Sequence, residues 1–204
     1  MQKKKKVIFF GDSITEGAIQ PGGFILKMDS MLEKKNIKMN YELIGSGVSS
    51  NKIYDLYLRL DEDVINKNPD VVVIFIGVND VWHKRILGTG TDADKFEKFY
   101  TATLQKLKDK NIQVVICTPA VIGEKTDLTN ELDGDLNKYS AIIRSLAAKN
   151  NLSLIDLRKI FIEYNLKHNV ENKEKGILTK DGVHLNNKGN QVVADEMWKV
   201  ISKL

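Results

Sequence analysis

The sequence predicts an α/β fold built around a mostly parallel sheet of five strands. Five short runs rich in β-branched residues alternate with longer amphipathic stretches, a pattern typical of repeated βαβ units. The third and fourth runs are almost wholly apolar, as central strands covered on both faces are. The length of 204 residues suits one domain with a sizeable core, and no repeat or low-complexity linker divides the chain. We therefore expect a single domain over residues 1–204.

Each expected element rests on a local pattern. Strands are expected at residues 7–10, 41–44, 71–76, 114–117 and, with a weaker pattern, 152–155. Apolar residues at helical spacing predict helices that include residues 24–32, 96–107, 142–147 and 192–201, and their methionine and aromatic side chains are expected in the core. Residues 123–135 are polar and rich in Gly, Asp, Thr and Asn, which predicts a surface loop and a candidate rim of a site.

Composition excludes several classes of site and partner. The single cysteine cannot form an internal disulfide, a Cys-x-x-Cys pair or a multi-cysteine zinc site. A His-rich metal centre would need nearly all of the three histidines. The net charge of +4 is spread along the chain without an Arg-rich stripe, so a nucleic-acid partner is not expected.

The amino-terminal residues do not resemble a targeting or membrane segment. The basic run Lys3 to Lys6 precedes only four apolar residues, Val7 to Phe10. A secretory signal needs an apolar region of about 7–15 residues, and a membrane span needs about 20. We therefore expect a soluble cytoplasmic protein without stable membrane insertion, or a secreted or periplasmic one if a leader has been removed.

Small and polar residues follow the first three strands. In an open parallel sheet, ligands bind beyond the carboxyl ends of the strands, so these segments are the candidates for a site. They are Gly11-Asp12-Ser13-Ile14-Thr15-Glu16-Gly17, then Gly45 to Asn51, then Gly77-Val78-Asn79-Asp80, and Asp181-Gly182-Val183-His184 precedes the last helix. Together they supply the parts of an acyl-transfer site: a nucleophile, a base, an orienting acid and oxyanion donors.

Each of these groups also has an ordinary structural interpretation. Ser13 and Glu16 match a capping box at a helix start. Asn79 suits a left-handed turn, Asp181 begins a common turn pair, and His184 alone is more often a turn or core residue. Because all four groups fall at one edge of the predicted sheet, the catalytic interpretation is favoured over four unrelated structural ones.

The four segments, in this order from residue 11 to residue 184, resemble the sequence blocks of the GDSL or SGNH hydrolases. The resemblance implies a flavodoxin-like three-layer α/β/α sandwich, with the whole chain as one domain of this kind. It also implies hydrolysis of esters or thioesters without a metal or other cofactor. By this resemblance Ser13 is the nucleophile and His184 is the base, oriented by Asp181. The backbone N–H groups of Ser13 and Gly47 and the Asn79 side chain form the oxyanion hole.

One position departs from the family pattern. Many members have a second glycine three residues after the one that matches Gly47, and Ser50 stands there in this chain. The path of the loop after Gly47 is therefore left open. Asp12, Trp82 and His83 are further candidates for contact with a substrate, although a packing indole and a rim histidine are equally consistent with the last two.

Two other reactive side chains are expected to take no part. Cys117 lies in an apolar run, where a buried thiol is usually inert. His168 lies in a polar region and is expected at the surface.

The expected function is a serine esterase that acts on small-molecule esters. A serine hydroxyl is a poor nucleophile near neutral pH and needs a base such as imidazole within hydrogen-bond reach. Short-chain esters, including acetyl groups on sugars, are favoured because the sequence has no long apolar lid segment. Lysophospholipids and acyl thioesters are the alternative substrates. A non-catalytic carbohydrate or small-molecule binding module would be expected to lack Ser13 or His184, and a nucleotide-binding protein would carry a Gly-x-Gly-x-x-Gly or Walker pattern.

Overall fold

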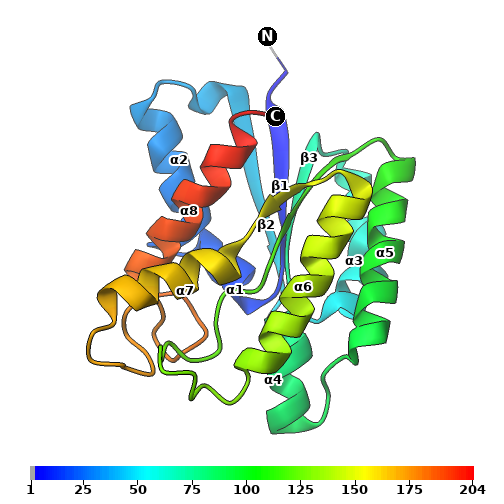
Figure 1. The fold of residues 1–204 in the computed structure, drawn as a ribbon. Helices are drawn as coiled ribbons and strands as arrows, with labels where there is room; N and C mark the ends of the chain where they lie inside the picture. The colour runs from blue at the N-terminus through cyan, green and yellow to red at the C-terminus, as the bar shows by residue number, and fades with distance from the viewer. Residues whose placement is uncertain (1–2) are drawn as a thin grey trace.

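One five-stranded parallel sheet forms the centre of residues 3–204, the part of the chain that the computed structural model describes (Figure 1). The spatial order is β2-β1-β3-β4-β5, and all four pairings are parallel. The strands are β1 (Lys5–Gly11), β2 (Tyr41–Gly47), β3 (Val71–Phe75), β4 (Gln113–Cys117) and β5 (Ser153–Ile155). The chain passes from β1 outward to β2 and then returns across β1 to β3, so the strand order reverses beside β1. Ligands bind at such switch points in open α/β sheets.

Helices cover both faces of the sheet. Figure 1 shows α2 (Phe24–Lys34), α7 (Leu157–His168) and α8 (Asn187–Ile201) on one side. The other side carries α3 (Ile53–Asp63), α5 (Ala93–Asp109) and α6 (Asp133–Asn150). The short α1 (Ser13–Glu16) and α4 (Val78–Leu87) follow β1 and β3, and three 3₁₀ turns are η1 (Gly17–Ile19), η2 (Lys38–Asn40) and η3 (Ile65–Lys67). The predicted three-layer α/β/α fold is therefore confirmed, and the sheet is wholly parallel.

Strand β1 shows why the sheet needs both helical layers. Successive side chains of a strand point to opposite faces. Val7 and Phe9 pack in the core cluster of α2, α7 and α8, whereas Ile8 and Phe10 pack in the cluster of α3, α5 and α6. All four are at most 1% exposed. The apolar run of β1 is therefore buried on both faces, as the sequence predicted for the runs that form β3 and β4.

Three helices were not among the elements expected from the sequence. In α3 only three positions are fully apolar and buried, and charged residues separate them. In α7 the buried face is narrow and includes the polar residues Arg158 and Asn165. The apolar residues alone therefore do not show a clear helical spacing. Helix α4 starts shortly after β3, and no capping side chain marks its first residue. None of the helices in residues 3–204 combines the length and the apolar character that crossing a bilayer requires.

Candidate active site

Strand register brings the first and second candidate segments together. Gly11, the last residue of β1, is paired with Gly47 at the end of β2 and with Phe75 at the end of β3. The three strands therefore end at one level, and Ser13 follows two residues later at the start of α1. The predicted meeting of these loops at one edge of the sheet is what the structure shows.

Asp12, and not Ser13, caps helix α1. The Asp12 carboxylate accepts a hydrogen bond of 3.0 Å from the Ile14 N–H group, and Glu16 accepts one from the Ser49 hydroxyl. The capping box that the sequence offered as an alternative role for Ser13 and Glu16 is therefore wrong. Because its neighbour supplies the cap, the hydroxyl of Ser13 is free to face another partner.

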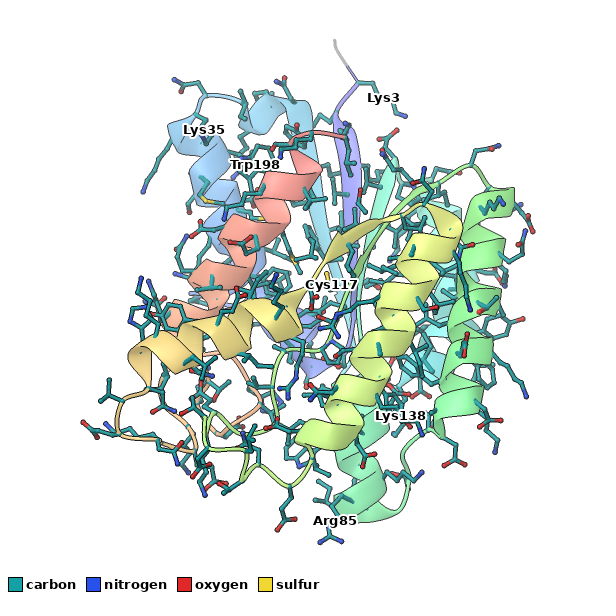
Figure 2. All side chains as sticks on the ribbon, viewed as in Figure 1. Lys3, Lys35, Arg85, Cys117, Lys138 and Trp198 are labelled. Atoms are coloured by element: carbon teal, nitrogen blue, oxygen red, sulfur yellow. The ribbon has the colours of Figure 1, made fainter. Side chains whose placement is uncertain are left out.

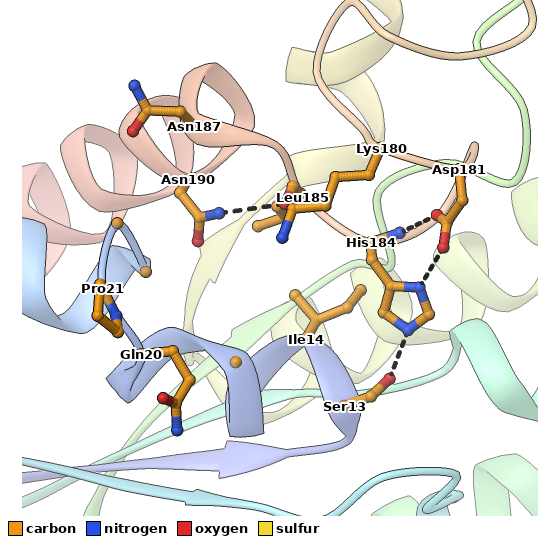
Figure 3. Close-up of a pocket in the computed structure, with 13 residues that line it drawn as sticks. Ser13, Ile14, Gln20, Pro21, Lys180, Asp181, His184, Leu185, Asn187 and Asn190 are labelled. Carbon is orange, nitrogen blue, oxygen red and sulfur yellow. Dashed lines mark hydrogen bonds and ion pairs between the residues drawn. The ribbon is translucent and has the colours of Figure 1, made fainter.

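That partner is His184. The Ser13 Oγ atom lies 3.0 Å from His184 Nε2, and His184 Nδ1 lies 2.7 Å from Asp181 Oδ2 (Figure 3). Both are hydrogen-bond distances. A proton on Nδ1, directed at the carboxylate, leaves Nε2 as an acceptor for the serine hydroxyl. The three side chains thus form the continuous chain of contacts that a nucleophile, a base and an orienting acid require.

Asp181 is held as a carboxylate. Partial burial acts to raise its pKa, but the hydrogen bond to the His184 ring and those from two backbone N–H groups leave the pKa below its ordinary value. The backbone donors are Val183 at 3.0 Å and His184 at 2.8 Å, both to Asp181 Oδ1. The second oxygen is left for the imidazole, so the turn itself orients the acid.

The loop that carries Asp181 and His184 is held in place by the buried carboxylate of Glu124. The turn is closed by a bridge between Thr179 and Leu185, and the Lys180 N–H group donates to the His184 carbonyl at 2.7 Å. Glu124, only 1% exposed, accepts the backbone N–H groups of residues 177, 178 and 179 at 2.9, 2.6 and 3.1 Å. Residues 123–135 were expected at the surface. The prediction is wrong for Glu124, because its carboxylate satisfies the backbone of another loop.

Gly47 packs directly against the helix that carries Ser13. A Cβ atom at Gly47 would lie 2.0 Å from the Glu16 nitrogen and 2.6 Å from the Asp12 carbonyl oxygen. Only a residue without a side chain allows this approach. The backbone of Gly47 is therefore held beside the first turn of α1, where an oxyanion at Ser13 would form.

Asn79 enters from the end of β3. Gly77, with φ of 123°, makes the turn into α4, a conformation that L side chains rarely adopt. Asn79 is 2% exposed, and its Nδ2 atom donates to the Asn51 carbonyl at 3.1 Å. An amide group has two N–H donors. One of them thus ties Asn79 to the loop that follows Gly47, and the other is the donor that a role in the oxyanion hole requires.

At position 50, where many family members have glycine, the backbone of the loop after Gly47 has a conformation typical of glycine. Ser50 has φ of 64°, in the left-handed region that glycine adopts without strain. Arg59 of α3 supports the same loop, donating to the Gly11 carbonyl at 2.8 Å, the Ser46 carbonyl at 3.1 Å and Asn51 Oδ1 at 2.7 Å. Sequence reasoning missed Arg59 because α3 was not predicted.

The three candidates for substrate contact have different surroundings. The Trp82 ring meets the His184 ring edge-on, with centroids 6.3 Å apart, and lines a hollow beside Asp181. Asp12 is 1% exposed, and burial raises its pKa from 3.8 to about 7. His83 is also buried, and burial, followed by the charge of Lys52, lowers its pKa. Only Trp82 is therefore placed at a surface that a substrate could reach.

Two further expectations concern residues outside the site. Cys117 is fully buried at the end of β4, in the middle of the molecule (Figure 2), and burial raises the pKa of its thiol. Such a thiol is a poor nucleophile. His168 is exposed at the end of α7. The structure agrees with the expectation that neither takes part.

Comparison with known proteins gives a consistent result. The family model of the GDSL-like Lipase/Acylhydrolase family matches residues 9–192. The acetylxylan esterase of Geobacillus stearothermophilus is 27% identical over 206 residues, covering 93% of this chain and 90% of that protein. An isoamyl acetate-hydrolyzing esterase 1 homolog of Rattus norvegicus is 24% identical over 211 residues, covering 97% of this chain and 82% of that protein.

Solved structures include a much more similar protein. The crystal structure of an acetyl xylan esterase, AlAXEase, is 63% identical with a TM-score of 0.95, over 96% of this chain and 99% of that chain. LAE5, an α/β hydrolase enzyme from the metagenome of Lake Arreo, has the same fold at 22% identity, with a TM-score of 0.84 over 98% of this chain and 95% of that chain. Since the family match spans most of the sequence and includes all four segments of the site, the chain belongs to the GDSL-like Lipase/Acylhydrolase family.

Proposed function

We propose that the protein removes acetyl groups from carbohydrates, with Ser13 as the nucleophile. Its family and relatives make it a serine carboxylic ester hydrolase. The observation that carries the proposal is the contact chain Ser13–His184–Asp181 in a protein that is 63% identical to an acetyl xylan esterase.

Acylation begins at the Ser13 hydroxyl. As Oγ attacks the carbonyl carbon of the acetyl group, the proton of the hydroxyl passes to His184 Nε2. Asp181, whose pKa is below its ordinary value, stays ionised and stabilises the imidazolium. The carbonyl oxygen becomes an oxyanion, for which the N–H groups of Ser13 and Gly47 and the free amide N–H of Asn79 are the donors.

The tetrahedral intermediate then collapses. The bond to the leaving sugar oxygen breaks, and the imidazolium of His184 returns its proton to that oxygen, releasing a sugar hydroxyl and leaving an acetyl ester on Ser13. A water molecule, deprotonated by the same imidazole, attacks this ester. Collapse of the second intermediate releases acetate and restores the Ser13 hydroxyl.

The surroundings of Ser13 favour a polar alcohol, and the similarity to acetylxylan esterases favours a short acyl group. The hollow that includes Ser13 and His184 is also lined by Gln20, Asn187 and Asn190. The hydrogen bond between Ser13 and His184 argues against a module that only binds carbohydrate.

Acetate release from acetylated xylooligosaccharides tests the proposal. We expect release by the wild-type protein and none above background by Ser13→Ala. A parallel series of p-nitrophenyl esters, from acetate to decanoate, is expected to show rates that fall with acyl length. Faster hydrolysis of the long esters, or of acyl thioesters, than of sugar acetates would refute the proposed substrate class.

A further inference from the structure

A hollow of about 510 Å³ extends away from Ser13 and His184. This volume is within the usual range for small-molecule sites, about 300–1,000 Å³. Ile14 and Leu185 form apolar parts of its lining, and Gly17, Gln20 and Pro21 continue it beyond α1. Figure 3 shows Gln20 and Pro21 at the end of the hollow away from Ser13.

The chemistry of the proposed reaction indicates which part of the substrate occupies this hollow. The departing oxygen takes its proton from His184 Nε2, so the alcohol of the ester must lie on the side of His184. The carbonyl oxygen must instead face the oxyanion donors. Ser13 and His184 line the hollow, whereas Gly47 and Asn79, two of the three proposed oxyanion donors, do not. The hollow is therefore on the alcohol side of the scissile bond.

The polar groups of this hollow suit a sugar. Figure 3 draws Gln20, Lys180 and Asn187 without a hydrogen bond to the other lining residues. In contrast, Asn190 uses its amide nitrogen on the carbonyls of Leu185 at 3.3 Å and of residue 186 at 2.9 Å. Carboxamides both donate and accept, which matches sugar hydroxyls, and an ammonium group adds a donor.

A second hollow, of about 400 Å³, lies on the other side of Asp181. Trp82 and Arg85 line it, together with residues 129–132. Neither Ser13 nor His184 is part of its lining, so the departing oxygen cannot lie there. A variant in this second hollow can therefore serve as a control for variants in the first hollow.

We infer that the hollow of Gln20, Lys180 and Asn187 is the subsite for the carbohydrate part of the ester, and that Gln20 and Asn187 bind sugar hydroxyls. The inference rests on the proposed function and adds the residues that determine its alcohol specificity. An aryl acetate has no hydroxyls for these side chains, so its hydrolysis should not depend on them.

The experiment compares two substrates across matched variants. For Gln20→Ala and Asn187→Ala we expect kcat/KM for an acetylated xylooligosaccharide to fall about 5- to 10-fold, as the loss of one or two neutral hydrogen bonds predicts. The kcat/KM for p-nitrophenyl acetate should stay within about twofold of the wild type, as expected for side chains that make no contact with the reacting atoms. The control Arg85→Ala removes an exposed side chain of the second hollow and should change neither value.

Inhibition gives an independent measurement. A deacetylated xylooligosaccharide should inhibit p-nitrophenyl acetate hydrolysis competitively, with an inhibition constant raised in Gln20→Ala and Asn187→Ala and unchanged in Arg85→Ala. Equal losses with both substrates, or a sugar-specific loss in Arg85→Ala alone, would overturn the subsite while leaving the proposed function intact. A wild-type protein that hydrolyses the aryl ester but not the sugar ester would overturn both.

Discussion

Gly47→Ala introduces a methyl group where the backbone of β2 packs against the first turn of α1. The new Cβ would lie 2.0 Å from the Glu16 nitrogen, 2.4 Å from the Thr15 carbonyl carbon and 2.6 Å from the Asp12 carbonyl oxygen. All three neighbours are backbone atoms and cannot rotate away. Since real Cβ contacts stay above 3.0 Å, the shortest one must open by at least about 1 Å, from 2.0 to 3.0 Å.

This shift is expected to lower both the thermal stability and the kcat of the variant. Overpacking in a tight region costs about 1–3 kcal/mol. At roughly 2–4 °C per kcal/mol for a chain of this length, Tm should fall by about 2–12 °C. The displaced backbone also carries Ser13, and a misplacement of about 1 Å at a reacting group can reduce kcat by about 100-fold.

The assay measures kcat for p-nitrophenyl acetate and Tm by circular dichroism. Gly134→Ala is the matched control, because no atom lies within 4 Å of the position that its new Cβ would take and its φ is ordinary. That variant should keep wild-type activity and an equal or higher Tm. Wild-type kcat and Tm in Gly47→Ala would refute the argument that Gly47 holds α1 and β2 in place.

Three further predictions concern carboxylates and the oxyanion amide. Asp181→Asn should lower kcat by about 10⁴-fold, because an amide no longer fixes the tautomer of His184; less than a tenfold loss in steady-state kinetics would contradict this role. Asn79→Ala should lower kcat about 10²- to 10³-fold with little change in KM, and an unchanged kcat would remove it from the oxyanion hole. Burial raises the pKa of Asp80 from 3.8 to about 7, so the folded state binds the extra proton and loses stability as pH rises from about 4 to 7. Asp80→Asn should therefore gain Tm relative to wild type between pH 5 and pH 8 in thermal melts, unlike the exposed control Asp109→Asn, and a difference independent of pH would contradict the argument.

The strands and the four candidate segments could be predicted because their signals are local. Apolar β-branched runs mark β1, β3 and β4, and small or polar residues directly after them mark the edge of the sheet. Parallel strands end at a common level, so Ser13 and Asn79 had to lie near each other. The order of the four segments along the chain was then the basis for the resemblance to the GDSL or SGNH hydrolases.

The supporting contacts could not be predicted because they depend on register and tertiary position. Arg59 and Glu124 each bond the backbone of a segment more than 40 residues away. A partly buried guanidinium such as that of Arg59, or a buried carboxylate such as that of Glu124, has the same sequence signature as an exposed one. The cap of α1 is a similar case, since a shift of one residue, from Ser13 to Asp12, decides which side chain caps the helix and which one is left to face His184.

The central claim is that Ser13 is a nucleophile activated by His184. Treatment of the folded wild-type protein with a fluorophosphonate, followed by peptide mass spectrometry, tests it directly. We expect one adduct, on the peptide that contains Ser13, together with loss of esterase activity in proportion to labelling. A fully active protein that stays unlabelled at Ser13, or an adduct on a different side chain that accounts for the lost activity, would contradict it.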